Sequence, residues 1–414
     1  MGLGPSIKMT TLHHFNCPIT RLLRNEENLE FVGIIVDGVS EVYDDKVYTA
    51  KRTADLAQAM RADAAIVSID GWGNHHVDFV NVIEELGIKN IPSVGLSFIG
   101  LQGRLVCTNK YVDCLVDFNK GESGYENCIV GDNNLTEYDA MKAIALLKLK
   151  LKRSGKEVDS KEFEKKILKR LLFKEYDIKK VEFGDETKIS RSLLTIDKDI
   201  ADKFKDMEER IENIKVNIIK PFEHNIFVNS NLDFMPIACK VRGELGEGIS
   251  SLLSGVSLML TGVEKVSGYQ PSNIGSSEGM LDKIVKFGQD GTPEASDYII
   301  HVDIEFREGE GRTAEGIMAA HKIADMILSD IRNEIKKIDD IPYRKEEFYD
   351  LAKENKRKVV LIKIVSGLGN MYDTSMFPYE PGGFIGSRQM MNSSNLPYVI
   401  SPNQCKDGAI HSLL

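Results

Sequence analysis

The fold is decided by Ala64-Ala65-Ile66-Val67-Ser68-Ile69, a run of small and apolar residues that leads directly into Asp70-Gly71-Trp72-Gly73-Asn74. A short, continuous apolar run that ends in a glycine-containing loop is typical of a strand buried on both faces. A second run of this kind lies upstream at residues 31–36, and residues 49–62 between the two runs have the spacing of a helix. This alternation predicts an α/β domain with an open, mostly parallel sheet of the Rossmann or flavodoxin type.

The same alternation extends the α/β domain from residue 1 to residue 153. Two further strands and a closing helix, which begins after the N-cap candidate Thr136, are predicted at residues 93–98, 113–118 and 134–153. Residues 154–180 lose the strand pattern and are rich in lysine and glutamate. We interpret them as a linker with a helical portion around residues 161–173.

Residues 181–414 follow a different pattern, which predicts a second domain of mixed α+β type. Residues 298–306 alternate between polar and apolar side chains, which indicates a half-buried strand. Residues 313–338 form an amphipathic helical pattern in which His321 lies on the apolar stripe, so a hydrogen-bonded core histidine is expected there. The other predicted strands of this domain lie at residues 215–222, 252–262 and 358–365.

Composition and charge exclude several classes of function. The 414 residues carry a formal net charge of -10, which argues against nucleic acid or an anionic membrane as the main partner, because both require a clustered basic surface. No apolar run is long enough to cross a bilayer, and the start of the chain lacks the pattern of a signal peptide. The six cysteines show neither zinc-site spacing nor a disulfide framework. We therefore expect a cytoplasmic protein with reduced thiols and no metal.

The loop after residue 69 is the first candidate for a functional site. In open parallel sheets, ligands bind beyond the carboxyl ends of the strands, where loop amides and a helix N-terminus converge. The glycines allow a ligand to approach the backbone, and Trp72 is the only tryptophan of the chain. We expect Asp70, Trp72, Asn74 and His75 to line a cleft for a substrate or partner. The alternative is a tight turn in which Trp72 packs over the domain edge and the paired histidines cap the helix.

Two other groups of residues admit more than one interpretation. His301, Asp303 and Glu305 share one face of the alternating strand and could hold a metal, although the water-facing side of a half-buried strand gives the same pattern more often. Cys405 lies in a polar terminal segment, so we expect it to be an exposed but non-catalytic thiol.

Several stretches are too specific to be generic loops. They are Gly4-Pro5-Ser6-Ile7-Lys8, His13-His14-Phe15, Asp70-Gly71-Trp72-Gly73-Asn74, Lys240-Val241-Arg242-Gly243-Glu244-Leu245-Gly246-Glu247-Gly248, Gly275-Ser276-Ser277-Glu278-Gly279, Met371-Tyr372-Asp373-Thr374 and Ser401-Pro402-Asn403. Together they resemble the D-proline reductase proprotein and the component B proproteins of glycine, sarcosine and betaine reductases. Residues 1–153 resemble the downstream part of the proprotein, and residues from about 176 onward resemble its upstream part. The chain is most similar to the two split accessory proteins of the proline reductase cluster, joined in swapped order.

This resemblance implies a reaction and a set of partners. In the family, a junction cysteine cleaves its own peptide bond and becomes a pyruvoyl group, which binds the substrate amine. A selenocysteine on a separate subunit then attacks, and a dithiol reductant completes the reductive opening of D-proline during amino-acid fermentation (the Stickland reaction). The implied partners are proline reductase subunits including a selenoprotein, the implied ligand is proline or another small amine, and a homo-oligomer is compatible with the resemblance.

The pyruvoyl group has no expected precursor in this chain. Met1-Gly2 stands about where the junction cysteine belongs, Asn16-Cys17-Pro18 lies beyond that position, and the chain contains no selenocysteine. We therefore expect no cofactor in this chain. The swapped order resembles a circular permutation, so the two chain ends should meet. Residues 2–8 are expected near residues 401–414, beside a pocket between the domains that is walled by His13, His14 and His411.

Two functions follow from the resemblance. The first is a subunit or paralogue of a selenium-dependent D-proline reductase system that lacks its own pyruvoyl group and has no autonomous active site. The second is a non-catalytic assembly or maturation scaffold that binds the processed reductase or its selenoprotein partner. Partner binding without any thermal stabilisation by proline would favour the second function over the first.

Overall fold

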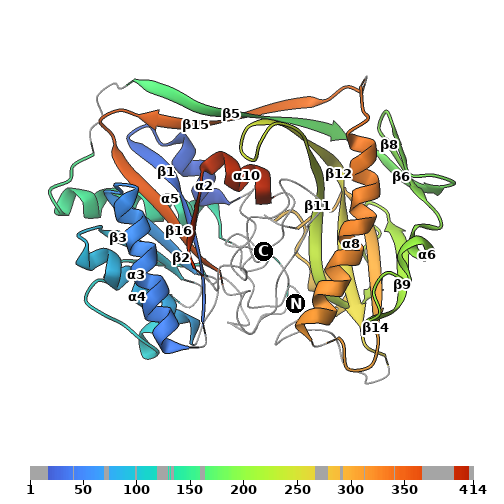
Figure 1. The fold of residues 1–414 in the computed structure, drawn as a ribbon, viewed down its shortest axis with the longest axis horizontal. Coiled ribbons are helices and arrows are strands. Elements are labelled where there is room, and N and C mark those ends of the chain that lie inside the picture. Colours follow the sequence, from blue (N-terminus) through green and yellow to red (C-terminus); the bar gives the residue numbers. More distant parts are fainter. Residues whose placement is uncertain are drawn as a thin grey trace.

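The chain forms two lobes that are joined by a long two-stranded ribbon (Figure 1). Helix α2 (Pro18–Asn25) and helix α10 (Pro402–Ala409), the first and last described helices, lie side by side under this ribbon. The structure, a computed structural model, describes residues 17–40, 42–69, 74–97, 100–118, 129, 131, 135–158, 164–265, 278–289, 292–311, 313–339, 341–365 and 396–409.

The first lobe is built on a six-stranded sheet within the described residues. Its strands are β1 (Leu29–Gly38), β2 (Ala64–Ile69), β3 (Ser93–Ser97), β4 (Leu115–Asp117), β16 (Arg357–Val365) and β17 (Tyr398–Ile400). Their order is β17-β1-β16-β2-β3-β4, and all neighbours are parallel except β17, which pairs antiparallel with β1. The central strands are continuous apolar runs because both faces of the sheet are covered.

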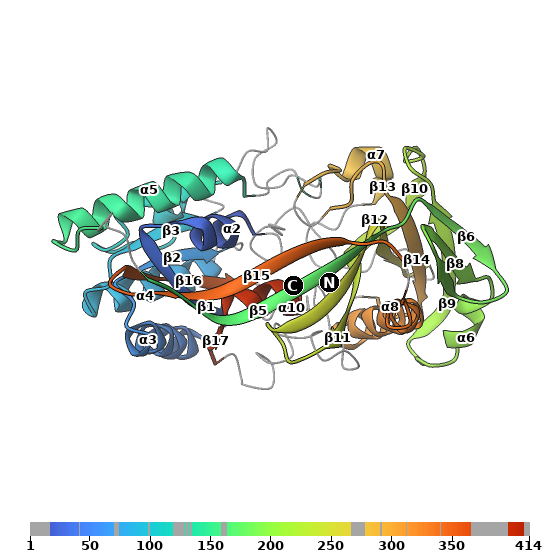
Figure 2. The same ribbon diagram turned by 90° about the horizontal axis from the view of Figure 1, so that it is seen from above.

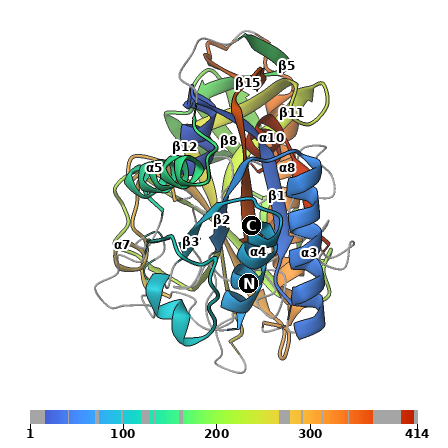
Figure 3. The same ribbon diagram turned by 90° about the vertical axis from the view of Figure 1, so that its left-hand side faces the viewer.

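Helices cover the two faces of this sheet (Figure 3). Helices α3 (Tyr43–Ala59) and α4 (His75–Ile88) pack on one face, where Ile362 belongs to their buried cluster. Helix α2 and helix α5 (Glu137–Arg153) pack on the other face, where Leu361 belongs to a second buried cluster. The predicted open, mostly parallel α/β sheet is therefore confirmed.

Strand β16 lies between β1 and β2, although most of the chain separates it from both. Phe31 pairs with Val359, and Ala65 pairs with Val360. The sequence predicts this strand but assigns it to the second domain. Residues 181–414 therefore contribute strands to both lobes, and the first sheet is incomplete without them.

The second lobe contains a mixed sheet, which agrees with the predicted α+β type. Its strands are β5 (Lys165–Asp177), β9 (Ile211–Ile219), β11 (Ser230–Arg242), β12 (Gly248–Val263), β14 (Tyr298–Phe306) and β15 (Arg344–Lys353). The order is β15-β5-β12-β14-β9, with β11 also paired to β12. Strand β12 runs parallel to β5 and β14, whereas the other pairs are antiparallel.

Helix α8 (Ala314–Ile335) covers one face of the mixed sheet, close to the predicted range of 313–338. His321 is fully buried within this helix. On the opposite face, Ile299 joins a core cluster that also contains Leu23 and Cys405. The two lobes therefore share one continuous apolar core.

The ribbon between the lobes corrects one sequence expectation. Residues 161–173 were expected to be partly helical within a linker, but strand β5 occupies Lys165–Asp177. It pairs antiparallel with β15 along its length and parallel with β12 toward its carboxyl end. Seen from above, β5 and β15 cross together from one lobe to the other (Figure 2). Residues 165–177 of the lysine-rich segment thus form an extended bridge between the lobes.

Smaller elements complete the described residues. They are η2 (Gly100–Leu105), β6 (Lys180–Gly184), β7 (Lys188–Ser190), β8 (Leu193–Asp197), α6 (Ile200–Phe204), β10 (Phe227–Val228), β13 (Gly279–Met280) and α7 (Leu281–Ile284). Within the described part of the chain, no helix combines the length and apolar character needed to span a membrane.

Candidate functional site

The carboxyl ends of the parallel strands β1, β16 and β2 meet at one edge of the first sheet, where Asp37 is the penultimate residue of β1. Asp37 is 1% exposed and accepts a hydrogen bond of 2.8 Å from the Thr53 hydroxyl of α3. Burial raises the pKa of Asp37 to about 7. The Thr53 hydrogen bond opposes this shift, and the nearby Asp78 carboxylate adds to it.

Lys46 and Asp78 form a buried ion pair beside Asp37. Their Nζ and Oδ2 atoms are 2.5 Å apart, and the side chains are 1% and 2% exposed. Lys46 comes from the first turn of α3 and Asp78 from the first turn of α4, and the backbone N–H of Ser40 donates to Asp78 at 3.4 Å. Burial raises the pKa of Asp78 to about 6, although Lys46 acts to lower it.

We call Asp37, Lys46, Thr53 and Asp78 the strand-end cluster. It contains two carboxyl groups whose raised pKa values lie near neutral pH, next to one ammonium group. Asp37 Oδ1 has no hydrogen-bond partner among the described residues. Groups with pKa values near the working pH are suited to general acid–base chemistry, and Asp37 and Asp78 have pKa values of this kind.

The strand-end cluster lies beside the start of α4, where Asn74 and His75 are predicted to line a cleft. Asn74 is the N-cap residue of α4, and His75 is its first residue and is 7% exposed. Both lie within one helical turn of Asp78. The other five selected residues lie outside those that the structure describes: Asp70, Trp72, His13, His14 and His411. The structure therefore brings Asn74 and His75 to the sheet edge, and the lining roles of all seven residues stay predictions.

Sequence reasoning missed Asp37, Lys46 and Asp78. Asp37 carries a usable signal, because it is a charged residue directly after the apolar run at residues 31–36. Lys46 and Asp78 are single charged residues within helices, which is an ordinary pattern. Their pairing depends on the packing of α3 against α4, which no local spacing encodes.

His76, two residues before Asp78 in α4, is enclosed by neighbouring residues. It is fully buried, and its ring centroid lies 5.3 Å from that of Phe79. A Cβ at Gly103 would come within 2.3 Å of the ring, so Gly103 allows the imidazole to fit. Neither ring nitrogen has a partner among the described residues, and burial lowers the pKa of His76 to about 4. The imidazole is therefore neutral at physiological pH.

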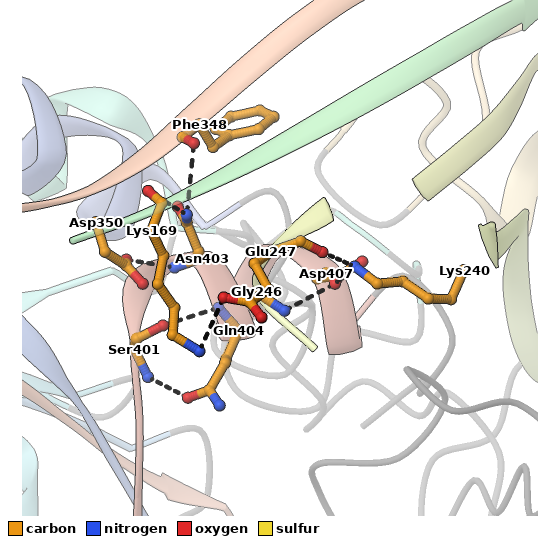
Figure 4. Close-up of polar contacts among 10 residues, drawn as sticks. All are labelled: Lys169, Lys240, Gly246, Glu247, Phe348, Asp350, Ser401, Asn403, Gln404 and Asp407. Carbon is orange, nitrogen blue, oxygen red and sulfur yellow. Dashed lines mark hydrogen bonds and ion pairs between the residues drawn. The ribbon is translucent and has the colours of Figure 1, made fainter. Parts of the chain in front are cut away.

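A second group of buried polar residues surrounds α10 (Figure 4). The Asp407 carboxylate is fully buried and accepts from Lys240 Nζ at 2.5 Å and from the Gly246 backbone N–H at 2.8 Å. The Ser250 hydroxyl donates to its other oxygen. Lys240, Gly246 and Ser250 belong to the β11–β12 hairpin of the second lobe. Helix α10 is thus bound to that lobe through one buried carboxylate.

The first turn of α10 is bound to the ribbon (Figure 4), and it is also bound to α2. Ser401 and Gln404 cap the helix reciprocally, each side chain accepting from the other backbone N–H. The Asn403 backbone N–H donates to Asp350 at 2.9 Å, and its side-chain amide donates to backbone oxygens of β5 and β15. Its side-chain oxygen accepts from Arg24 Nη2 at 3.1 Å. Asn403 therefore joins α10, α2 and both ribbon strands.

The thiol of Cys405 corrects a second expectation. Cys405 was expected to be exposed, but it is fully buried, because α10 packs onto the shared core instead of extending into solvent. Burial raises the pKa of Cys405 to about 12, so the thiol is protonated at neutral pH. Cys17, 2% exposed, belongs to the same core cluster. The described residues nearest the two chain ends therefore meet, whereas residues 2–8 lie outside the described residues.

The face of β14 that was considered for a metal carries a hydrogen-bonded network. The Thr261 hydroxyl donates to Asp303 and is 2.7 Å from His301 Nε2, which must then donate to it. His301 is 7% exposed, so this end of the face is buried and does not face water. No group of three or more potential metal ligands occurs in the described residues.

Known proteins that resemble this chain are reductase components. The sequence profile described as glycine/sarcosine/betaine reductase component B subunits matches residues 3–115 and 169–412. The D-proline reductase proprotein PrdA of Acetoanaerobium sticklandii is 35% identical over 252 residues, which cover 60% of this chain and 40% of that protein. The glycine reductase complex component B subunits alpha and beta of the same organism are 25% identical over 256 residues, which cover 57% and 54%.

A third relative is the betaine reductase complex component B subunit alpha of Peptoclostridium acidaminophilum. It is 31% identical over 94 residues, which cover 22% of this chain and 21% of that protein. The chain thus matches about half or less of the length of each of these curated relatives. No solved structure matches the chain.

Proposed function

Because the chain belongs to the family of glycine, sarcosine and betaine reductase component B subunits, we propose that it is a subunit of a reductase complex that acts on D-proline or a related small amine. The observation that carries this proposal is the position of β16 between β1 and β2. The two segments matched by the family profile both contribute strands to this sheet, so they build one folded unit.

The strand-end cluster supports a catalytic contribution. A reductase that opens a C–N bond must deliver protons to its product, and Asp37 and Asp78 have raised pKa values suited to that task. Lys46 holds Asp78 in place through the buried ion pair. In this proposal Asp37 exchanges the proton, and Lys46 is a positioning residue.

The proposal also covers partners and the prosthetic group. The complex includes a selenoprotein and works in the cytoplasm, and this chain adds no pyruvoyl group of its own. Cys405 supports the last point. Its backbone N–H belongs to the peptide bond that a pyruvoyl-forming cleavage at this residue would break, and it donates to the Ser401 carbonyl at 2.9 Å.

Co-expression with the subunits of a D-proline reductase tests the proposed function. We expect the chain to co-purify with them and D-proline to raise its melting temperature. An Asp37→Asn variant should co-purify equally well but lower the turnover of the complex, whereas Asp185→Asn, at an exposed site, should leave turnover unchanged. A wild-type chain that binds no reductase subunit would contradict the proposal.

Intact-mass measurement tests the pyruvoyl statement separately. A single polypeptide at the mass of the sequence, unreactive toward hydrazine reagents, is expected. Two fragments, one of them blocked at its N-terminus, would overturn that statement and leave the subunit proposal in place.

A non-catalytic assembly or maturation scaffold is the second candidate function. The burial of both Cys17 and Cys405 favours it, because neither thiol is accessible for covalent chemistry at the junction of the lobes. A chain that binds the reductase, shows no thermal shift with D-proline and tolerates Asp37→Asn without loss of turnover would be this scaffold.

A further inference from the structure

Helix α5 presents an apolar stripe on its outward face. Its buried side packs on the first sheet, and the helix lies along the outer edge of that lobe (Figure 2). Tyr138, Met141 and Leu149 are 61%, 49% and 42% exposed, and Ala145 between them is also exposed. Residues separated by three, seven and eleven positions lie on the same side of a helix. The four side chains therefore form one continuous stripe that no other part of the chain covers.

Basic side chains border the apolar stripe. Lys142 lies over the Tyr138 ring, with Nζ 4.1 Å from the ring centroid. Lys152 and Arg153 follow at the carboxyl end of α5, where both are exposed and neither forms an ion pair with a residue that the structure describes. Glu137, the exposed acid of the helix, is already engaged in an ion pair of 3.5 Å with α2. The outward face is therefore apolar along its centre and positively charged toward its carboxyl end.

A hollow of about 470 Å³ extends this surface at the carboxyl end of α5. Its lining includes Lys110, Lys150 and Lys156 together with Tyr111 and Asp113. Lys150 Nζ is bonded to Asp113 at 2.5 Å, so the other two lysines give the hollow a net positive charge. Because Lys150 belongs to the last turn of α5, the hollow opens beside the end of the apolar stripe.

The size and charge of this surface indicate the kind of partner that fits it. A standard protein interface takes about 800 Å² from each partner. The stripe from Tyr138 to Leu149 is about 17 Å long, so an interface of that size must include the hollow as well. A second copy of this chain fits poorly, because a two-fold contact through α5 sets the cations of one face against those of the other. A different protein with apolar side chains and carboxylates is complementary in both respects.

We propose that the outward face of α5 and the neighbouring hollow form a docking surface for another subunit of the reductase complex, one that presents apolar side chains bordered by acidic residues. The identity of this partner rests on the proposed function, whereas the surface itself rests on α5 and the hollow. Apolar side chains of the partner cover Tyr138, Met141 and Leu149, and its carboxylates approach Lys152 and Arg153. Burial of the stripe supplies the affinity, and the charges orient the partner.

Calorimetric titration of the full chain with the purified subunits of a D-proline reductase tests the proposal. Met141→Asp and Leu149→Asp each place a carboxylate in the stripe and should weaken binding by about tenfold or more. Met207→Asp, in the second lobe at a site that is 54% exposed, is the matched control and should bind like the wild type. All three sites are exposed, so the variants should keep the melting temperature of the wild type.

Charge reversal at the carboxyl end of α5 tests the electrostatic contribution. Lys152→Glu and Arg153→Glu should each weaken binding by about fivefold at low salt, and by less at high salt, because salt screens exposed charges. Lys188→Glu is the matched control, since this lysine is 61% exposed in the second lobe, and it should bind like the wild type at either salt concentration.

The outcomes distinguish a failure of this inference from a failure of the proposed function. A wild-type chain that binds no reductase subunit overturns the proposed function and this partner with it. If the wild type binds and both stripe variants bind equally tightly, the docking surface alone is wrong. Sedimentation of the wild type as a dimer that Met141→Asp dissociates would assign the face to a second copy and overturn the inference. Binding to vesicles of anionic lipid that the same substitution abolishes would assign it to a membrane, with the same consequence.

Discussion

Asp407 Oδ2 lies 2.5 Å from Lys240 Nζ, although 167 residues separate the two in the sequence. Their side chains are 0% and 3% exposed, so the ion pair is shielded from water and from salt. Lys240 belongs to the second lobe, while α10 follows directly on β17 of the first sheet. The pair therefore connects the two lobes, and neither side chain can replace its partner with water.

Removing the Asp407 charge should destabilise the protein strongly. Asp407→Asn leaves the Lys240 ammonium buried without its counter-charge, so the free energy of unfolding should fall by roughly 3–5 kcal/mol. Urea denaturation measures this change. Asp185→Asn, which removes a pair whose aspartate side chain is 93% exposed, is the control and should leave stability unchanged. If both substitutions lower the free energy of unfolding by the same amount, the buried pair stabilises the protein no more than the exposed pair does.

Asp37 should make the protein less stable as the pH rises. Its folded pKa of about 7 lies above the ordinary value of 3.8, so between these values the folded state binds more protons than the unfolded state. Stability contributed by the protonated form is thus lost from about pH 4 to pH 7. Asp37→Asn removes this dependence, so its stability relative to the wild type should increase by roughly 2–3 kcal/mol from pH 5 to pH 8. Urea unfolding across this range checks it, and a constant difference would contradict the shifted pKa.

Gly103→Ala should test the enclosure of His76. The new Cβ would come within 2.3 Å of the buried ring, so the substitution should cost about 1–3 kcal/mol of stability. In a His76→Ala background the space is open, and the same substitution should cost much less. Thermal or urea unfolding of the wild type, the two single variants and the double variant gives the coupling free energy between Gly103 and His76. Additive effects would mean that Gly103 and His76 do not meet.

The thiols should differ in their reactivity in the folded protein. Cys405 is fully buried with a pKa raised to about 12, whereas Cys107 is half-buried. Iodoacetamide at pH 8 should therefore modify Cys107 well before Cys405, and unfolding in urea should remove the difference. Peptide mass spectrometry resolves the sites. Rapid native labelling of Cys405 would place α10 away from the core.

Elements with a strong local pattern could be predicted from the sequence. The alternating residues 298–306 form β14, because their apolar side chains pack against α8. Thr136 caps α5 through reciprocal hydrogen bonds with Asp139, a local motif that needs no distant partner. In such segments the periodicity and the tertiary burial agree.

Strand β5 could not be predicted because its sequence lacks this pattern. Lys165–Asp177 is largely exposed and rich in charged residues, so its apolar residues do not alternate clearly. Its extended conformation depends on pairing with β12 and β15, which lie far downstream. Tertiary pairing decides its conformation, and local propensity does not.

The candidate site could be located only in part. The carboxyl edge of the sheet followed from the strand pattern, which led to Asn74 and His75. The chemistry at that edge depends on Asp37, Lys46 and Asp78, which come from three different elements. Likewise, nothing within residues 401–409 indicates that Asp407 pairs with Lys240. Contacts of this kind arise from packing and are not visible in spacing.

The position of β16 has a consequence for synthesis on the ribosome. Strands β1 and β2 are made early, but the strand that pairs with both of them consists of residues 357–365. At typical rates of translation, on the order of tens of seconds pass between the synthesis of β1 and β2 and the synthesis of β16. During this interval their apolar runs present unpaired backbone groups, the feature that chaperones cover and that promotes aggregation. The first sheet is therefore completed only after most of the second lobe has been synthesised.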